Sequence, residues 1–286
     1  LPLLALRAGN RGFFAEADMD LGLAGQTAVV AGGANGIGRA IAAAFAAEGA
    51  NVALLDLDPG VAAVAKELGE HSRVQTLSFA ADVTDFEAMR QSADEVQAIL
   101  GRTDHVVYGV AIGSGKYGFP FWNLEPADWR KVLEVNVLGA VNVAHAFAPV
   151  LVQAGSGTLL LLASVAGQIG SQTDPPYSAS KAAVINFAQC AAKDLAPHGV
   201  RVNVLCPGMV ETALNRSVWQ AWQRQQPENR TQTYDEWTEE KIRRLVPLGR
   251  WQSAEDIAAM AVFLASSRAC NITGQTINVD GGFVMH

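Results

Sequence analysis

Short apolar runs alternate with helical segments from residue 26 to about residue 203, and this alternation is what most constrains the fold. The runs lack a regular change from apolar to polar residues, which is typical of strands buried on both faces. They lie at 27–30, 52–56, 74–80, 106–107, 158–163 and 200–205, with a last one at 276–279. Helices are predicted at 38–48, 61–68, 84–100, 128–150, 177–195 and 254–265. Strands separated by helices predict an α/β fold with a doubly wound parallel sheet.

One stretch, residues 209–250, interrupts this alternation. It combines many glutamines and mixed charge with several large aromatic residues: Trp219, Trp222, Tyr234 and Trp237. We interpret it as a helical insertion in a single domain that spans residues 19–286. Residues 1–18 precede the fold pattern and lack the basic start and cleavage site of a signal peptide. They are interpreted as an N-terminal extension, either flexible or packed on a neighbouring subunit.

The charge and cysteine content argue against several classes of partner. The formal net charge is -7, which disfavours a nucleic-acid or anionic-membrane partner. The three cysteines (Cys190, Cys206 and Cys270) are widely spaced, so neither a disulfide framework nor a metal site is expected. No uninterrupted run of 18 apolar residues suggests a membrane span. These features favour a cytoplasmic protein that acts on a small molecule.

A glycine-rich loop follows the first predicted strand and directly precedes a helix. Its spacing is Gly32-x3-Gly36-Ile37-Gly38, with Asn35 inside the loop. Glycines permit a tight turn and let the backbone approach a pyrophosphate, which then meets the positive end of the helix. Between a strand and a helix, this loop predicts a dinucleotide site in a Rossmann-like sheet.

Two acidic positions at strand ends bear on the identity of the dinucleotide. Asp56 ends the second strand, where a carboxylate can accept both ribose hydroxyls of NAD and would repel the 2′-phosphate of NADP. The alternative is that Asp56 is only a turn residue. Asp82 and Val83 follow the third strand and could meet the adenine through a carboxylate and a backbone amide. NAD is therefore the expected cofactor, and NADP is disfavoured.

Tyr177 and Lys181 are four residues apart on a predicted helix, and Ser164 lies thirteen residues upstream. Residues at i and i+4 share a helix face, so an ammonium group could stabilise the phenolate and lower its pKa from about 10. A serine hydroxyl could hold the substrate oxygen beside the phenol while an alcohol loses its proton. The alternative is an ordinary amphipathic helix, since Tyr-x3-Lys also arises by chance.

Together, these motifs resemble the short-chain dehydrogenase/reductase family over residues 24–286. The matching pieces include the glycine loop, Asp82-Val83, Asn136, Ser164, Tyr177-x3-Lys181, Pro207-Gly208 and the ending Val279-Asp280-Gly281-Gly282. Two positions depart from the family pattern: Ala31 replaces a frequent threonine, and Tyr108-Gly109-Val110-Ala111 replaces Asn-Asn-Ala-Gly. Neither departure removes a catalytic group, but the second puts the usual contacts of that strand end in doubt.

The resemblance implies a role for each catalytic residue. Tyr177 would be the general acid/base, Lys181 would lower its pKa and bind the nicotinamide ribose beside it, and Ser164 would polarise the substrate oxygen. Asn136 would hold a water in a proton relay; it could also cap a helix kink, and the two interpretations are compatible. The nicotinamide would be lined by Pro207, Gly208 and Val210, with Thr212 near its carboxamide.

The substrate is less constrained by the sequence. The insertion at 209–250 would close over the substrate, and the candidate contacts are Gly113, Ser114, Gln168, Trp219 and Trp222, with Ser171 as a further polar candidate. Arginines of the insertion (Arg216, Arg224, Arg243 and Arg244) could bind an acid, although a solvated helix face is favoured. The long lid is similar to those of polyol, sugar-alcohol and diol dehydrogenases of the family. The resemblance thus implies oxidation of a secondary alcohol, with a 3-oxoacyl or steroid-type reductase and a dinucleotide-sensing scaffold as alternatives. It also implies a homotetramer that pairs through 128–150 and 177–195.

Overall fold

The computed structural model describes residues 20–171, 173–227 and 230–285, so the predicted extension at 1–18 lies outside the described residues. Within them, one sheet carries seven parallel strands in the order β3-β2-β1-β4-β5-β6-β7. The strands are β1 (Thr27–Ala31), β2 (Asn51–Asp56), β3 (Thr76–Ala80), β4 (His105–Tyr108), β5 (Gly157–Leu162), β6 (Val200–Pro207) and β7 (Thr276–Val279). Strand order reverses between β1 and β4, which confirms the doubly wound Rossmann-like sheet.

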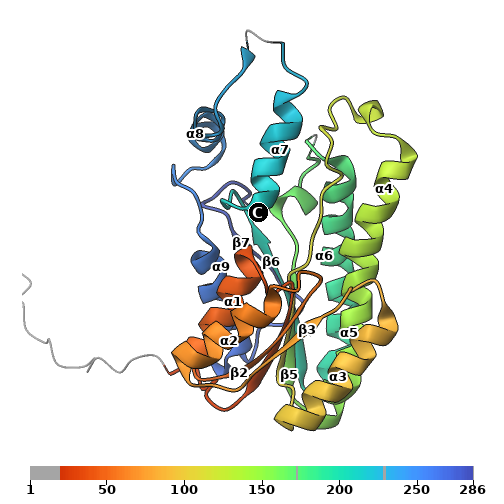
Figure 1. Ribbon diagram of the computed structural model, residues 1–286, viewed down its shortest axis with the longest axis vertical. Coiled ribbons are helices and arrows are strands. Elements are labelled where there is room, and N and C mark those ends of the chain that lie inside the picture. Colours follow the sequence, from red (N-terminus) through yellow and green to blue (C-terminus); the bar gives the residue numbers. More distant parts are fainter. Residues whose placement is uncertain (1–19, 172, 228–229, 286) are drawn as a thin grey trace, which may run out of the picture.

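Helices cover both faces of the sheet (Figure 1). One face packs against α1 (Gly36–Ala47), α2 (Val61–Ser72) and α9 (Ala254–Ala265). The other packs against α3 (Phe86–Leu100), α5 (Gly139–Ala154) and α6 (Pro175–Leu195). Successive side chains of a strand point to opposite faces. Val29 and Val30 therefore enter different halves of the core, and both are fully buried. This double burial explains why the strands are apolar throughout.

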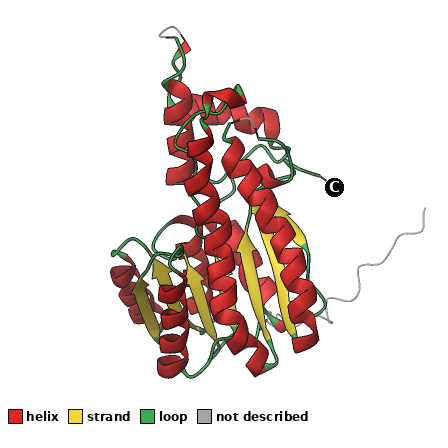
Figure 2. Cartoon of the chain, turned by 90° about the vertical axis from the view of Figure 1, so that its right-hand side faces the viewer, coloured by secondary structure: helices red, strands yellow, loops and turns green. Residues whose placement is uncertain are grey.

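A long helix crosses the second face with a local widening in its middle. It comprises α4 (Pro126–Leu133), a π-helical turn (Glu134–Leu138) and α5, where the sequence predicts one helix at 128–150. Figure 2 shows that the long helices in front of the strands extend beyond the sheet. Short 3₁₀ turns lie at Phe121–Asn123, Val165–Gly167, Ala196–His198 and Ser267–Ala269.

In the described part of the chain, one helix, Pro126–Ala154, is long and apolar enough to cross a membrane by length and composition alone (mean hydropathy 1.7). The sequence-based count missed it because polar residues interrupt the apolar ones. Val143, Phe147 and Leu151 of this helix are buried in the core of the second face. A core helix passes the same test of length and composition, so this match is weak evidence for a membrane span.

The predicted insertion forms two helices, α7 (Ala213–Gln223) and α8 (Tyr234–Leu245), which project beyond the sheet (Figure 1). Thr212 begins α7 by accepting a hydrogen bond from the Asn215 amide, and Thr233 begins α8 in a capping box with Glu236. Aromatic contacts join the two helices: the rings of Trp219 and Tyr234 lie 5.7 Å apart. The insertion at 209–250 is therefore helical, as predicted, and its closure over a substrate stays a prediction; we call it the lid.

Candidate active site

The glycine loop has the geometry that a pyrophosphate requires. Gly32 and Gly36 have φ angles of +86° and +54°, which L side chains rarely adopt. A Cβ on Gly38 would lie 1.9 Å from the Gly32 carbonyl oxygen, so only glycine lets α1 pack this closely. Asn35 precedes α1 without capping it, because its side-chain amide donates to Asp58 instead. The first amides of α1 thus lack a side-chain cap, which fits an anionic group at the helix N-terminus.

Asp56 lies beside this loop at the end of β2. Its Oδ2 accepts a hydrogen bond from the Ala34 amide at 3.0 Å, and its Oδ1 accepts one from the Asp58 amide at 3.0 Å. Arg39, the first cation of α1, forms an ion pair with Glu67 at 2.8 Å. Asp56 is therefore held at the loop by backbone amides, whereas the side chain of Arg39 is paired with Glu67.

Asp82 and Val83, the residues predicted to contact the adenine, stabilise the turn after β3. Asp82 Oδ1 accepts hydrogen bonds from the amide and the hydroxyl of Thr84, at 2.9 and 2.8 Å. The Val83 carbonyl accepts a hydrogen bond from Asn142, and its side chain is buried. Neither residue lines the catalytic cavity, so their contact with an adenine stays a prediction.

A cavity of about 460 Å³ at the carboxyl ends of the strands brings most of the predicted site together. The predicted residues that line it are Asn35, Gly36, Ile37, Gly38, Ser164, Tyr177, Lys181, Pro207, Gly208, Val210 and Thr212. The predicted residues outside its lining are Gly32, Asp56, Asp82, Val83, Asn136, Gly113, Ser114, Gln168, Trp219 and Trp222. The cavity thus joins the glycine loop to the Ser-Tyr-Lys set, as a site for dinucleotide-linked chemistry requires.

The phenol of Tyr177 is buried beside Ser164, and burial raises its pKa to about 12, although the hydrogen bond with Ser164 acts in the opposite direction. The ammonium of Lys181 lies 5.7 Å from the centre of the Tyr177 ring and donates to the Leu162 carbonyl at 2.7 Å. The predicted lowering of the Tyr177 pKa by Lys181 is therefore not met in this arrangement, because the ammonium faces a strand carbonyl and desolvation dominates.

Lys181 is itself almost fully buried on α6. Burial lowers the pKa of its ammonium to about 8, while Cys206 on the neighbouring strand acts to raise it. Ser164 lies two residues after β5 and caps the 3₁₀ turn Val165–Gly167, where its Oγ accepts a hydrogen bond from the Ala166 amide at 3.1 Å. The three side chains are thus fixed by elements that the sheet and α6 position, as their sequence spacing predicts.

Asn136 lies in the π-helical turn between α4 and α5. Its Oδ1 accepts from the Ile112 amide at 2.8 Å, and its Nδ2 donates to the Ile112 carbonyl and to Ser180 Oγ, both at 2.9 Å. These bonds tie the kinked helix to the loop after β4 and to α6. Asn136 therefore has a structural role as a bridge between these elements, while the capping of a kink and the water relay both stay predictions.

Tyr108 explains the departure from the family pattern after the fourth strand. Its buried hydroxyl donates to the Val135 carbonyl in the π-helical turn, and burial raises the pKa of this phenol. A Cβ on Gly139 would lie 2.7 Å from that hydroxyl oxygen, so Gly139 makes room for it. Tyr108 thus supports the kink that holds Asn136.

The predicted aromatic substrate wall is placed differently. Trp219 Nε1 donates to the Gln232 carbonyl at 3.2 Å, and Trp222 packs against Trp237, so both hold the lid helices together and neither lines the cavity. Gln168 is directed to β7, where its Nε2 donates to Asn278 at 2.7 Å. None of these three residues lines the cavity in this structure, so their contact with a substrate stays a prediction. Their residue types alone do not tell in which direction the side chains point.

Gly113 and Ser114 do not line the cavity themselves, but they lie next to a residue that does, Asp174. The sequence did not identify this residue. Asp174 lines the cavity, and its carboxylate accepts hydrogen bonds from the amides of Ser114 at 2.8 Å and Tyr177 at 3.5 Å. Burial raises its pKa. An Asp directly before Pro175 is the signal of an N-cap that could have located it. Ser171, the other polar candidate, lines the cavity as predicted.

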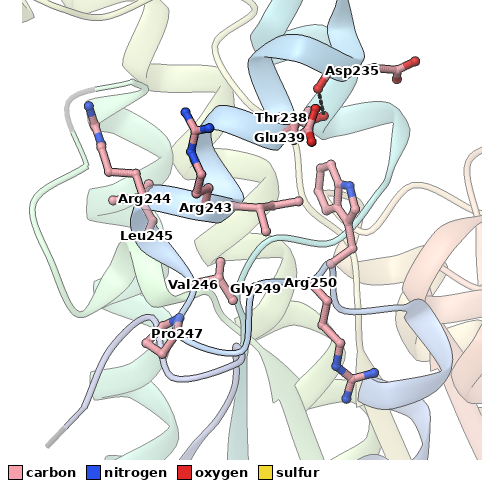
Figure 3. Close-up of a pocket in the computed structure, with 12 residues that line it drawn as sticks. Asp235, Thr238, Glu239, Arg243, Arg244, Leu245, Val246, Pro247, Gly249 and Arg250 are labelled. Atoms are coloured by element: carbon pink, nitrogen blue, oxygen red, sulfur yellow. Dashed lines mark hydrogen bonds between the residues drawn. The ribbon is translucent and has the colours of Figure 1, made fainter.

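The lid also bears a second hollow, of about 810 Å³, on α8 and the turn that follows it. Its lining includes no predicted catalytic residue. Figure 3 shows that Arg243 and Arg244 extend to one side of this hollow and Arg250 to the other, so their guanidinium groups do not converge. Arg243, Arg244, Arg216 and Arg224 are exposed, which agrees with the solvated interpretation of these arginines.

A dinucleotide loop, a Ser-Tyr-Lys set and a cavity that joins them define a nicotinamide-dependent oxidoreductase of the doubly wound α/β class. The family model described as "Enoyl-(Acyl carrier protein) reductase" matches residues 31–284. The chain belongs to the short-chain dehydrogenase/reductase family and is an oxidoreductase that acts on CH–OH groups.

Three similar proteins illustrate the range of this family. D-threitol dehydrogenase of Mycolicibacterium smegmatis is 34% identical over 94% of this chain and 96% of its own length. (3R)-3-hydroxyacyl-CoA dehydrogenase of Mus musculus is 35% identical over 90% of this chain and 96% of its own length. The structure of L-sorbose reductase from Gluconobacter frateurii, complexed with NADPH and L-sorbose, has a TM-score of 0.84 and 28% identity, covering 94% of this chain and 100% of the other.

Proposed function

We propose that this protein interconverts a secondary alcohol, of the polyol, sugar-alcohol or diol class, and its ketone with NAD. The observation that carries the proposal is the single cavity lined by Ser164, Tyr177 and Lys181 and by the start of α1. The similarity to a threitol dehydrogenase and a sorbose reductase supports a polyhydroxylated substrate.

Each catalytic side chain has a defined task in this proposal. Ser164 Oγ holds the substrate oxygen, and Tyr177 Oη takes the alcohol proton during oxidation and returns it during reduction. NAD would be held by the start of α1 and the adjoining cavity, and it would supply the acceptor for the hydride of the carbinol carbon. Because burial raises the pKa of Tyr177 to about 12 in this arrangement, a positive charge closer to the phenol would be needed for it to act as a base near neutral pH. The Lys181 ammonium, 5.7 Å from the centre of the Tyr177 ring, would supply that charge if it moved from the Leu162 carbonyl towards the phenol.

The preference for NAD rests on Asp56. Its carboxylate lies at the loop where the adenosine ribose would bind, and a 2′-phosphate there would meet a negative charge. Membership of the family does not decide the matter, because the sorbose reductase structure contains NADPH. We therefore expect NAD to be used at least about 10-fold better than NADP, in line with one repulsive charge contact.

A reductase of 3-oxoacyl or steroid-type carbonyl groups is the second candidate. The mouse relative named as a 3-hydroxyacyl-CoA dehydrogenase supports it, and so do the apolar side chains that the lid adds to the cavity, such as Leu214 and Val218. A dinucleotide-sensing scaffold is a third candidate, and the complete Ser-Tyr-Lys set argues against it.

The first experiment measures initial rates with NAD and with NADP over polyols, diols, hydroxyacyl thioesters and steroid alcohols. We expect turnover of one polyol or diol class, and Tyr177→Phe should lower kcat by about 10³-fold while NADH still binds, because the proton acceptor is lost. Tyr117→Phe, which lies outside the cavity lining, is the matched control and should keep wild-type rates. An active Tyr177→Phe protein would refute the assigned chemistry.

The assembly and location of the protein extend the proposal. We propose a cytoplasmic homotetramer that pairs through α5 and α6. The resemblance to the family supports this pairing; Leu138, which directly precedes α5, is 56% exposed, but a single exposed leucine is normal on a monomer. Light scattering of the purified protein would test the assembly, and fractionation of cells would test the location.

A further inference from the structure

One face of α8 forms a wall of the catalytic cavity. Trp237, Lys241 and Leu245 are successive residues at i, i+4 and i+8, and all three line the cavity. The Lys241 ammonium lies 3.9 Å from the centre of the Trp237 ring. The lid thus presents one cation to the cavity, flanked by an aromatic and an aliphatic side chain. No role for Lys241 follows from the dinucleotide loop or from the Ser-Tyr-Lys set.

Lys241 makes no ion pair or hydrogen bond with any residue in the described ranges 20–171, 173–227 and 230–285. Some other charged residues of the chain do form such pairs: Arg216 lies 3.5 Å from Glu211, and Lys116 lies 2.8 Å from Asp128. Unlike Arg243 and Arg244, which are also unpaired within the described residues but are exposed, Lys241 is partly buried. Burial, assisted by the nearby Arg244, lowers the pKa of Lys241 to about 8, so the ammonium is still charged at pH 7. A partly buried charge without a counterion is costly, and a bound anion would offset that cost.

The acidic group of the same cavity does not supply that counterion. The Asp174 carboxylate accepts hydrogen bonds from the backbone amides of Ser114 and Tyr177, and it caps the N-terminus of α6. Lys181, the second cation that lines the cavity, donates to the Leu162 carbonyl. A pyrophosphate fits the start of α1, where the amides lack a side-chain cap. The Lys241 ammonium is thus left for a second anion, which the substrate can bring.

We propose that Lys241 is a specificity-determining residue that binds a carboxylate of the substrate, so that the secondary alcohol is a polyhydroxylated acid rather than a neutral polyol. This inference rests on the proposed function and narrows its substrate class. A lysine ammonium suits a single carboxylate as a compact point charge. The Trp237 ring contacts the Lys241 ammonium in a cation–π interaction, which orders that group before the acid binds.

The experiment compares aldonates and alditols of four to six carbons with the same carbinol configuration, using NAD and initial rates. Wild-type protein should favour the aldonate in kcat/KM by at least about 10-fold. Lys241→Met keeps an unbranched stem and removes the charge. It should lower kcat/KM for the aldonate by about 10- to 100-fold, mainly through KM, as expected for loss of one charge-assisted contact. The alditol should change by less than about 3-fold, and Lys241→Arg should retain most of the aldonate activity.

Arg243→Met is the matched control, because Arg243 is an exposed cation of the same helix that does not line the cavity. It should leave the ratio of aldonate to alditol unchanged. Circular dichroism shows whether each variant is folded, and NADH fluorescence titration measures its affinity for the cofactor. If Lys241→Met weakens NADH binding by 10-fold or more, Lys241 serves a cofactor phosphate and the inference is wrong.

Two further outcomes separate the inference from the function on which it rests. If wild-type protein oxidises alditols at least as well as aldonates, and Lys241→Met keeps the ratio, the inference fails while the proposed function stands. If wild-type protein binds NADH but oxidises neither class, the proposed function fails and the inference falls with it. A selective loss of aldonate activity in Lys241→Met, with Arg243→Met unaffected, supports both.

Discussion

The sheet and the lid of this molecule are built on different principles. The strands of the sheet lie between helices on both faces, and β1, for example, is buried at every residue. The lid has only a small apolar cluster of its own, formed by Met209, Ile242, Val246 and the adjoining Trp251. It is held mostly by aromatic contacts between α7 and α8. The sheet therefore has the larger share of the buried core, whereas the lid resembles the surface segments that can vary without loss of the fold.

The same difference explains the character of the two cations in the cavity. Lys181 is fixed by α6 and by a strand carbonyl, as a catalytic group must be. Lys241 is held only by an aromatic ring on a surface helix. Substitutions in the sheet should thus change folding or kcat, whereas substitutions in the lid should change KM with little effect on folding.

Among the glycines of the described residues, Gly38→Ala should give the largest loss of stability. The added Cβ would lie 1.9 Å from the Gly32 carbonyl oxygen, which is backbone and cannot move without opening the loop. We expect a loss of about 3 kcal/mol or more in the free energy of unfolding, at the upper end of overpacking effects. Chemical denaturation and NADH titration would measure both consequences.

Gly170→Ala is the matched control for this prediction. Gly170 has open space around the position of its Cβ and a φ outside the left-handed region, so the added methyl group should change stability by less than about 0.5 kcal/mol. Equal stability of the two variants would show that the contact between α1 and the loop can relax. The contrast between a tightly packed sheet and a loosely packed lid would then be weaker.

His105 makes the sheet sensitive to acid. It is buried on β4, hydrogen-bonds with Thr158 and Gln26, and burial lowers its pKa to about 4. In the unfolded chain its pKa is about 6.5, so between pH 6.5 and 4 only the unfolded state takes up the proton, and stability falls as pH falls. From pH 7 to pH 5 this group should cost the folded state about 2 kcal/mol.

The measurement follows urea unfolding at pH 7 and pH 5 for wild-type protein, for His105→Gln and for His71→Gln. His71 is exposed on α2, so its variant should keep the full pH dependence, and His105→Gln should lose part of it. NMR titration of the His105 ring tests the cause directly, even if His105→Gln folds poorly. A ring that titrates near pH 6.5 would contradict the prediction.

Sequence reasoning succeeded where spacing alone determines position. The glycine loop, Ser164, Tyr177 and Lys181 line one cavity because each stands at a strand end or on a helix that the apolar pattern locates. It failed where the function of a residue depends on the direction in which its side chain points. Trp222 and Trp237 are both lid tryptophans, yet only Trp237 lines the cavity, and no periodicity distinguishes them.

The electrostatics of the site were also beyond the sequence. The i, i+4 spacing places Lys181 near Tyr177 but does not reveal that its ammonium donates to the Leu162 carbonyl. Burial then dominates the pKa of both groups, which depends on the packing of α6 against β5 and β6. Asp174 and Lys241 were missed for a related reason. Their importance comes from what surrounds them in the cavity and not from a motif.

Trp219→Ala should have little effect on the stability of the sheet and thereby test the independence of the lid. Trp219 packs edge-on against Tyr234 and donates to the Gln232 carbonyl, all within the lid. Its loss removes contacts between α7 and α8 but none in either half of the sheet core. We expect a change below about 1 kcal/mol in the unfolding of the sheet, with KM raised several-fold because the cavity wall is less ordered. Denaturation followed by far-UV circular dichroism, together with steady-state kinetics, separates the two effects. If Trp219→Ala unfolds the sheet as strongly as Gly38→Ala does, the lid is a structural part of the core, and substitutions there cannot be interpreted as changes of specificity alone.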